Sequence, residues 1–380
     1  MRNTGIICEY NPLHLGHKKQ LDRIRAEYPE DGIVCLMSGN FVQRGKPAVF
    51  DKLTRAKAAI LSGADLVLEL PVTAALSSAE GFASQGVQIL CRLCDRLCFG
   101  AETADRELLT DTARLLLSKE FQDALRQQLE KGLSFPAARQ AALGQLGPDA
   151  SILETPNNIL AVEYCKAILS QNSAITPFPI LRQGSYHDTA ADPENPSATA
   201  VRGLMEAGDG WKSFVPDCCY DLFHSAPVHT LQAGEKAILA RLRTMTDAEF
   251  EALPYGSEGL WRKLMKNARS CTTLEEILTA TKSKRYTRTR LDRMVMCAFL
   301  GLTEADLASP APYARVLAFN DKGREILKQA RQTAHLPNIG QKQDDPYQAI
   351  ESRVASLYGL FSVTPEPPDA ESTARVQYVP

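Results

Sequence analysis

Residues 5–17, GIICEYNPLHLGH, contain the features that decide the fold of this chain. The apolar run at residues 5–8 predicts a buried first strand, and a turn with Pro12 leads into a helix that opens near Gly16. His14 and His17 are three positions apart, so they share a face on the first turn of that helix. Free N–H groups at a helix start attract phosphate oxygens. Imidazole groups there can donate hydrogen bonds to charge that builds on a phosphate.

Two histidines at a helix start can instead be caps or surface side chains. Their position favours a nucleotide site, because open parallel sheets bind ligands beyond the carboxyl ends of their strands. This pair follows directly on the first predicted strand. The segment therefore predicts a site for a nucleoside triphosphate.

Strand and helix signals alternate along the first two hundred residues. Short apolar runs predict strands at residues 5–9, 32–37, 65–70, 95–99 and 176–182. Helical periodicity predicts helices at residues 16–27, 51–61, 78–93, 104–145 and 157–169. Strands that alternate with helices predict the α/β class, with a Rossmann-like, doubly wound parallel sheet.

The pattern changes in the second half of the chain. A polar, Pro-rich loop covers residues 187–198. Further helices are predicted at residues 233–245, 247–252, 258–269, 273–280, 285–299, 303–307 and 320–333. We therefore expect a catalytic α/β domain over residues 1–220, an α-helical domain over residues 221–362 and a disordered tail over residues 363–380.

The totals limit the class of protein. The chain has 380 residues, and 43 Lys and Arg against 45 Asp and Glu give a net charge of −2. Any nucleic-acid site must therefore be a local basic patch. No apolar run reaches the length of a membrane helix, and the first strand leaves no room for a signal peptide. We expect a cytoplasmic protein without a membrane partner, whose ten cysteines are reduced.

One cysteine cluster resembles part of a metal site. Cys91, Cys94 and Cys98 have spacings that could hold a metal or part of an iron–sulfur cluster. The sequence offers no matching second pair of ligands, and Cys98 lies in a predicted strand. We expect buried thiols and no metal site.

Two loops after predicted strands carry polar groups. The segment at residues 38–47 includes Asn40, Arg44 and Lys46, and its cations can bind a phosphate or a carboxylate. A solvated surface loop is the alternative. Gly100 follows the fourth strand and permits close approach of a ribose or a phosphate, although a simple turn at the strand end is the favoured interpretation of this residue alone.

Three later polar groups fit the same site. Asn157 and Asn158 open a helix, where one Asn serves as a cap and the other amide is left to contact a nucleoside. Arg182 ends the fifth strand. The hydroxyls of Ser197 and Thr199 and the guanidinium of Arg202 can form a second phosphate cradle at a helix start. An ordinary cap with a solvated arginine is the alternative.

Several motifs together resemble one family. HxGH near the start and SxTxxR near residue 200 resemble the HIGH-motif nucleotidyltransferase superfamily. Within it, the chain is similar to the tRNA(Met) cytidine acetate ligase family over nearly its whole length to about residue 340. The motifs that carry this resemblance are EYNPLHLGH (9–17), SGNFVQRGKPA (38–48), GADLVLELP (63–71), FGAE (99–102), PNNILAVEY (156–164), SATAVR (197–202) and YARVLAFNDKGREIL (313–327).

The resemblance implies an activity. ATP activates acetate as acetyl-adenylate with release of pyrophosphate. The acetyl group then passes to the wobble cytidine of elongator tRNA(Met) and gives N4-acetylcytidine. ATP is thus a substrate, Mg²⁺ is expected to accompany it, and the partners are acetate and tRNA. The oligomeric state is not predicted.

The resemblance also implies roles for single residues. The catalytic set is His14, His17 and Arg202. The ATP-binding set is Ile7, Glu9, Tyr10, Asn11, Pro12, His14, Gly16, His17, Gln20, Gly100, Asn157, Asn158, Arg182, Ser197, Thr199 and Arg202. Phosphate or acetate would contact Asn40, Arg44 and Lys46. One position departs from the family pattern, because Ala101 stands where a serine is expected after Gly100.

The helical half holds the best local basic patch. It consists of Lys282, Lys284, Arg285, Arg288, Arg290 and Arg293, with Tyr286 among them. Such a cluster binds RNA phosphates, and an aromatic ring can stack an unpaired base. A solvated helix face is the alternative. We expect tRNA to contact this patch.

Two other functions stay open. A nucleotidyltransferase that acts on a small phosphorylated metabolite would share the HxGH segment, but it rarely needs a basic helical half of this size. A tRNA-binding protein with an inactive site is disfavoured by the intact His14, Gly16, His17 and Arg202.

Overall fold

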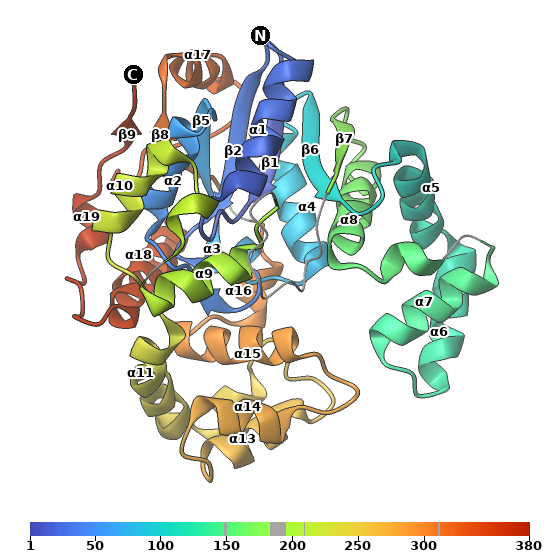
Figure 1. Ribbon diagram of the computed structural model, residues 1–380. Coiled ribbons are helices and arrows are strands. Elements are labelled where there is room, and N and C mark those ends of the chain that lie inside the picture. The colour runs from blue at the N-terminus through green and yellow to red at the C-terminus, as the bar shows by residue number, and fades with distance from the viewer. Residues whose placement is uncertain (148–149, 183–194, 209, 311) are drawn as a thin grey trace.

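The computed structural model describes residues 1–147, 150–182, 195–208, 210–310 and 312–380 (Figure 1). Within these residues, seven strands form one sheet in the order β7-β6-β1-β2-β5-β8-β9. Their bounds are β1 (Asn3–Cys8), β2 (Gly32–Ser38), β5 (Leu66–Leu70), β6 (Arg96–Ala101), β7 (Thr176–Leu181), β8 (Arg315–Phe319) and β9 (Gln377–Tyr378). A separate hairpin pairs β3 (Phe41–Val42) with β4 (Lys46–Pro47).

Helices surround the sheet and form the second half of the chain. In the first half they are α1 (Leu15–Glu27), α2 (Lys52–Leu61), α3 (Val72–Ala75), α4 (Ala79–Leu90), α5 (Arg106–Leu117), α6 (Lys119–Glu130), α7 (Phe135–Gln145), α8 (Pro156–Ser170) and α9 (Ala198–Ala207). In the second half they are α10 (Asp217–Ser225), α11 (Leu231–Thr244), α12 (Asp247–Glu251), α13 (Leu260–Ala268), α14 (Leu274–Thr281), α15 (Arg288–Leu300), α16 (Glu304–Ala308), α17 (Asp321–Ala330), α18 (Pro346–Tyr358) and α19 (Ala370–Thr373).

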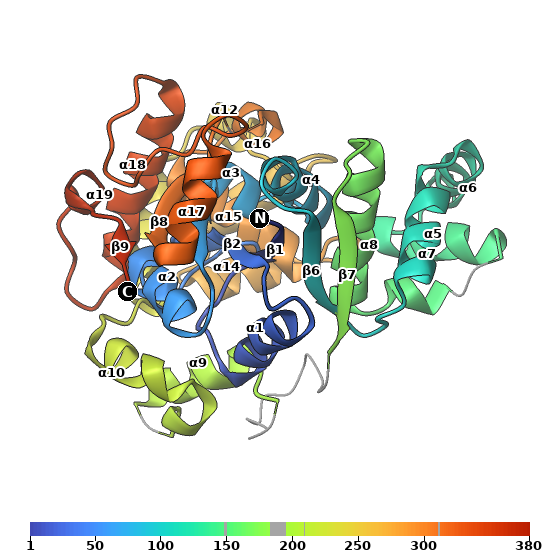
Figure 2. The same ribbon diagram turned by 90° about the horizontal axis from the view of Figure 1, so that it is seen from above.

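The central strands are apolar on both faces because helices cover both sides of the sheet. Ile7, Val34 and Leu36 pack into one core with α4, α8 and α17. Their neighbours Ile6 and Cys35 point the other way, into a core with α1, α2, α9 and α10. Figure 2 shows these two layers on opposite sides of the strands. A third core joins α11, α13, α14 and α15, which gather beyond the carboxyl ends of the strands (Figure 1).

The predicted doubly wound α/β fold is confirmed, with parallel pairing among β7, β6, β1, β2 and β5. The prediction missed β8, which adds to the sheet antiparallel to β5, and β9, which pairs with β8. The sequence of β8, RVLAF, is too short to show its pairing with β5, some 250 residues earlier. The chain therefore returns from the helical half to the sheet.

The prediction of a disordered tail at residues 363–380 is wrong. The segment forms α19 and β9, and its Glu371 is buried. The expectation of buried cysteines holds for Cys94 and Cys98, whereas Cys91 is exposed. Among the described residues, no group of His, Cys, Asp or Glu is placed to hold a metal. Nor does the described part of the chain contain a helix with the length and apolar character needed to cross a membrane.

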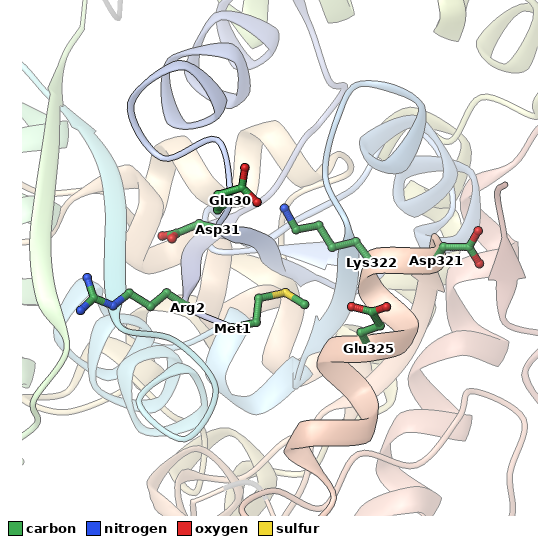
Figure 3. Close-up of a pocket in the computed structure, with 7 residues that line it drawn as sticks. All are labelled: Met1, Arg2, Glu30, Asp31, Asp321, Lys322 and Glu325. Atoms are coloured by element: carbon green, nitrogen blue, oxygen red, sulfur yellow. The ribbon is translucent and has the colours of Figure 1, made fainter.

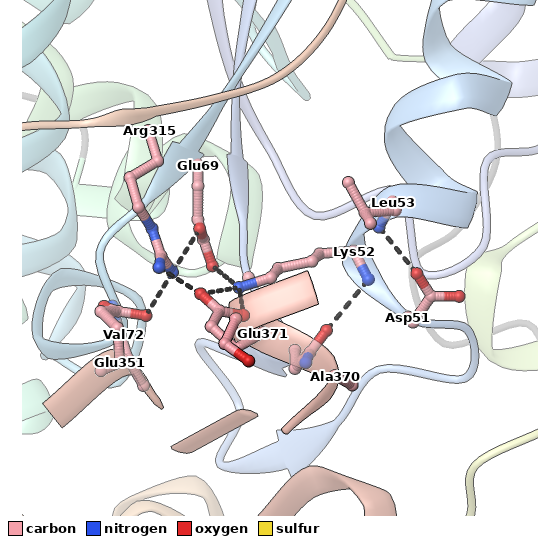
Figure 4. A network of polar contacts seen from close by, with 12 residues as sticks. Asp51, Lys52, Leu53, Glu69, Val72, Arg315, Glu351, Ala370 and Glu371 are labelled. Atoms are coloured by element: carbon pink, nitrogen blue, oxygen red, sulfur yellow. Dashed lines mark hydrogen bonds and ion pairs between the residues drawn. The ribbon is translucent and has the colours of Figure 1, made fainter. Parts of the chain in front are cut away.

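A buried ion-pair network holds the tail against the sheet (Figure 4). Lys52 Nζ lies 2.9 Å from Glu69 Oε1 and 2.8 Å from Glu371 Oε2. Arg315 pairs with Glu69 at 2.7 Å and also contacts Glu351 and Glu371. Burial alone would raise the pKa of Glu69, but Arg315 and Lys52 hold it below its usual value. A tail rich in Pro and Glu is thus ordered because one carboxylate completes a charge network in the interior.

We predict that Arg315→Met lowers the free energy of unfolding by about 3–5 kcal/mol, because it leaves buried carboxylates without their cation. Arg114→Met removes an arginine from an exposed pair with Asp111 and should change that free energy by less than about 0.5 kcal/mol. Urea unfolding followed by circular dichroism measures both. Equal stability of the two variants would show that the network does not hold the fold together.

Candidate active site

The two histidines of HxGH cap α1 with one nitrogen each. His14 is the N-cap residue, and its Nδ1 accepts a hydrogen bond of 3.1 Å from the Gly16 N–H. The His14 N–H in turn donates to His17 Nδ1 at 3.3 Å. The rings stack with their centroids 3.8 Å apart. Because both Nδ1 atoms accept, the ring proton of each neutral imidazole lies on Nε2, which is then a donor toward a ligand.

The surroundings keep both imidazoles neutral. Burial lowers the pKa of His14 well below its usual value, and His17, Arg182 and Arg202 lower it further. Burial and then Arg182 lower the pKa of His17 to about 3. At neutral pH the pair therefore acts through N–H groups and not through positive charge.

Gly16 is required by its close neighbours. A Cβ atom at this position would lie 3.0 Å from Cε1 of His14 and 3.8 Å from the carbonyl oxygen of Pro196. The His14 ring therefore fills the space beside Gly16. Any side chain here would displace that imidazole.

The structure brings the second predicted cradle onto the first. Arg202, on α9, donates from Nη1 to the carbonyl of Asn11 and from Nη2 to Thr199 Oγ1 at 3.1 Å. Ser197 caps α9 by accepting from the Ala200 N–H at 3.0 Å. The start of the chain and the segment near residue 200 are therefore in contact, and we call the place where they meet the crevice.

A carboxylate that the sequence analysis did not assign connects the remaining polar groups. Glu102 accepts hydrogen bonds from Thr155 Oγ1 at 2.9 Å and from Asn157 Nδ2 at 2.6 Å. Asn157 Oδ1 then accepts from Arg182 Nη1 at 3.2 Å. Asn158 is buried, and its amide bonds to Thr103 instead. The Asn157 side chain thus orients Arg182, whereas the Asn158 side chain ties α8 to the loop after β6.

Gly100 borders open space. A Cβ atom built on it would meet no heavy atom within 4 Å. Arg182 and the histidine pair lie close enough to influence each other electrostatically. Room beside a glycine, cations and neutral N–H donors suit a nucleotide with its phosphates.

The other residues predicted near ATP shape the turn after β1. Tyr10 is buried with a φ of 44°, and its hydroxyl lies 3.5 Å from Cys35 Sγ. Asn11 Oδ1 accepts from the Val49 N–H at 2.8 Å, and Pro12 follows it in the turn. Ile7 packs in the core, and Gln20 Nε2 lies 3.5 Å from Cys98 Sγ. These side chains are engaged with the protein and position the histidines.

Arg55 is a functional residue that the sequence analysis missed. Its guanidinium is fully buried on α2 and donates to the carbonyls of Glu9, Ser38, Gly39 and Phe50. It therefore joins the ends of β1 and β2, where the site begins. The sequence gives no signal that sets Arg55 apart, because α2 also carries the cations Lys52 and Lys57.

The loop at residues 38–47 folds as the β3–β4 hairpin beside the crevice. Asn40 Oδ1 accepts from the Lys52 N–H at 2.9 Å, and the Gln43 N–H donates to Glu9 Oε1 at 2.9 Å. Arg44 is half-buried and lies near enough to Arg202 to lower its pKa, after the larger effects of burial and Glu9. Lys46 is exposed. Asn40 is therefore structural, and Arg44 belongs to the crevice.

The predicted tRNA patch is only partly exposed. Arg293 is buried, with Nη1 3.4 Å from the carbonyl of Gln43, so its assignment to an exposed patch is wrong. Arg290 donates to the carbonyl of Tyr255 at 2.8 Å. Arg290 thus satisfies a backbone carbonyl inside the helical half, and Arg293 satisfies one on the loop between β3 and β4. Four cations reach the surface: Lys282, Lys284, Arg285 and Arg288.

A depression lies at the amino ends of the strands, away from the histidines. It has a volume of about 540 Å³ and is formed where β1, β2 and α17 begin (Figure 3). Its lining residues are Met1, Arg2, Glu30, Asp31, Asp321, Lys322 and Glu325. The mixed charges are not arranged around a common point, and the depression is remote from the histidines.

We predict that the His17 ring stays neutral down to about pH 5, two pH units above its pKa of about 3. Ring ¹⁵N spectra should show Nδ1 unprotonated throughout, with a His17→Ala variant to assign the signal. Titration near pH 6.5 would contradict the geometry. The unfolded chain binds a proton at this histidine below about pH 6.5 and the folded chain does not, so stability should fall as pH decreases from 6.5 toward 3.

Comparisons with known proteins agree with this geometry. The family model for HIGH Nucleotidyl Transferase matches residues 1–371. The tRNA(Met) cytidine acetate ligase of Clostridium novyi is 38% identical over 357 residues, which cover 89% of each chain. That of Clostridium tetani is 36% identical and covers 97% of this chain and 98% of its own.

Solved structures extend the comparison to three dimensions. The crystal structure of apo Thermotoga maritima TmcAL superimposes with a TM-score of 0.92 at 31% identity, covering all of both chains. The same protein bound with alpha-thio ATP gives a TM-score of 0.89 at 29% identity, again over both whole chains. The chain therefore belongs to the HIGH nucleotidyltransferase superfamily and, within it, to the tRNA(Met) cytidine acetate ligase family.

Proposed function

We propose that this chain is an ATP-dependent ligase that acetylates the wobble cytidine of elongator tRNA(Met). The observation that carries the proposal is the convergence of the His14–His17 pair and Arg202 on one crevice. Relatives at 34–38% identity are named tRNA(Met) cytidine acetate ligase. A solved relative holds an ATP analogue.

The first step activates acetate. A carboxylate oxygen of acetate attacks the α-phosphorus of ATP, the bond from that phosphorus to the bridging oxygen breaks, and pyrophosphate leaves. The Nε2–H groups of His14 and His17 donate to the α-phosphate oxygens as charge builds there. Arg202 and Arg44 hold the leaving pyrophosphate, and Arg182 contacts the nucleotide.

The second step transfers the acetyl group. The exocyclic amine of cytidine is a weak nucleophile because it is conjugated with the ring. It attacks the carbonyl carbon of acetyl-adenylate, AMP leaves, and the amine loses a proton. A mixed anhydride with AMP supplies the leaving group that free acetate lacks.

Mg²⁺ fits this scheme as a companion of the triphosphate. No cluster of three or more His, Cys, Asp or Glu in the described residues is built to hold it. Mg²⁺ in nucleotide sites is often held largely by phosphates and water. Glu9 is the carboxylate that acts most strongly on the cations of the cradle, since it raises the pKa of Arg44 and Arg202 against the effect of their burial.

We place the tRNA on the helical half, where Lys282, Lys284, Arg285 and Arg288 reach the surface. These four cations form a basic face beyond the carboxyl edge of the sheet, while Arg290 and the buried Arg293 fix the Tyr255 and Gln43 segments beneath it. This division gives nucleotide chemistry to the sheet with its covering helices and RNA binding to the helical core of α11, α13, α14 and α15.

The decisive experiment is mass spectrometry of tRNA nucleosides after incubation with ATP, labelled acetate and total tRNA. We expect labelled N4-acetylcytidine in elongator tRNA(Met). ATP–pyrophosphate exchange should require acetate. Exchange that needs a phosphorylated metabolite and ignores acetate would replace this function by that of a small-molecule nucleotidyltransferase.

We predict that His17→Ala lowers kcat roughly 10²- to 10³-fold, the usual loss for one donor to a developing oxyanion. His335→Ala removes an exposed histidine remote from the crevice and should leave kcat unchanged. Steady-state acetylation of tRNA measures both. Full turnover by the His17 variant would exclude this ring from the mechanism.

A further inference from the structure

The guanidinium of Arg288 binds a buried carboxylate on one side and an exposed carboxylate on the other. Its Nε donates to Asp292 Oδ1 at 2.9 Å, and the Asp292 side chain is only 7% exposed. Its Nη1 and Nη2 donate to the two oxygens of Glu275, at 2.8 and 2.6 Å. Asp292 therefore fixes the orientation of the guanidinium, and Glu275 occupies its Nη1 and Nη2 donors.

Glu275 is the more exposed partner of its ion pair with Arg288. Its side chain is 68% exposed on α14, whereas that of Arg288 is 33% exposed. Because Glu275 is largely exposed, solvent and salt screen this ion pair in spite of its bidentate geometry. Two oxygens of a phosphate match the same paired N–H groups, and arginine binds phosphate in this bidentate manner. Exchange of Glu275 for a phosphate thus keeps every donor of Arg288 satisfied.

A second cation lies close to Arg288, on the β3–β4 hairpin. Lys46 is exposed on β4, and β4 packs against α15. Gly45 makes this approach possible, since a Cβ there would lie 2.4 Å from the Arg293 nitrogen and its φ is +71°. The charge of Lys46 acts on both Glu275 and Asp292. Arg44, one residue before Gly45, belongs to the crevice.

We propose that Arg288 and Lys46 form a binding site for a backbone phosphate of RNA, which Glu275 occupies until RNA displaces it. The inference rests on the proposed function, because RNA is the substrate that brings a chain of phosphates to this face. A phosphate held here lies beside the hairpin that carries Arg44, so binding directs the strand toward the crevice.

Glu275→Gln tests the exchange by a gain of function. The substitution removes the competing charge, so the Kd for unmodified tRNA(Met) should decrease roughly twofold to fivefold, as expected for loss of an exposed ion pair. Asp111→Asn removes the same charge from an exposed Arg–Asp pair on α5 and should leave Kd unchanged. Fluorescence anisotropy over a series of salt concentrations measures both.

Loss-of-function variants complete the test. Lys46→Ala should weaken binding and reduce the salt slope by roughly 0.7 to 0.9, the value for one phosphate contact. In Glu275→Gln/Arg288→Lys, the gain should disappear, because lysine keeps the charge but lacks the fork. Lys46 is exposed, so its variant remains informative if replacement of Arg288 prevents folding.

Defined results would overturn the inference. Unchanged or weaker tRNA binding by Glu275→Gln would do so. If this variant bound poly-glutamate more tightly but tRNA no more tightly, the site would favour an acidic polypeptide over RNA, and the inference would also fail. Mass spectrometry of the same reactions separates the two proposals. Labelled acetylcytidine together with an unchanged Kd would leave the proposed function standing and remove the phosphate site.

Discussion

Arg55 satisfies four backbone carbonyl groups at the place where β1 and β2 leave the sheet. Parallel strands that end together expose carbonyl oxygens in the interior, and these need donors. A guanidinium has five N–H groups in one plane, so one side chain can serve several segments. Burial lowers the pKa of Arg55, and the charges of Tyr358 and Asp51 act in the opposite direction. The carboxyl ends of β1 and β2 are thereby held together by a single cation.

The histidine pair builds on this fixed edge. Glu9 follows β1, and its carbonyl is one of the four that Arg55 holds. The chain then turns through Tyr10 at a φ of 44° and reaches His14, which caps α1. Each ring uses Nδ1 to complete the helix start. Structure and chemistry therefore use different nitrogens of the same side chain, and the fold itself determines which nitrogen faces the ligand.

The sequence could predict those elements that depend only on residues close together in the chain. The apolar runs of β1, β2 and β5 and the cap motif of α1 are read within a few residues. The other features depend on contacts between residues far apart in the chain, which the sequence does not show. β8 is recognisable only through its pairing with β5, and Glu371 only through Lys52 and Arg315. Likewise, a basic run does not tell whether an arginine meets solvent, as Arg288 does, or a buried carbonyl, as Arg293 does.

In the crevice, the arginines carry the positive charge and the histidines are neutral. Arg44, Arg182 and Arg202 have pKa values lowered by burial, yet a guanidinium stays charged at any physiological pH. Two imidazolium rings stacked at 3.8 Å beside these cations would repel each other and the arginines. Neutral histidines avoid that repulsion and still offer an N–H to a phosphate oxygen. In the proposed reaction, the arginines would attract the triphosphate, while the histidines would respond to charge that develops during the reaction.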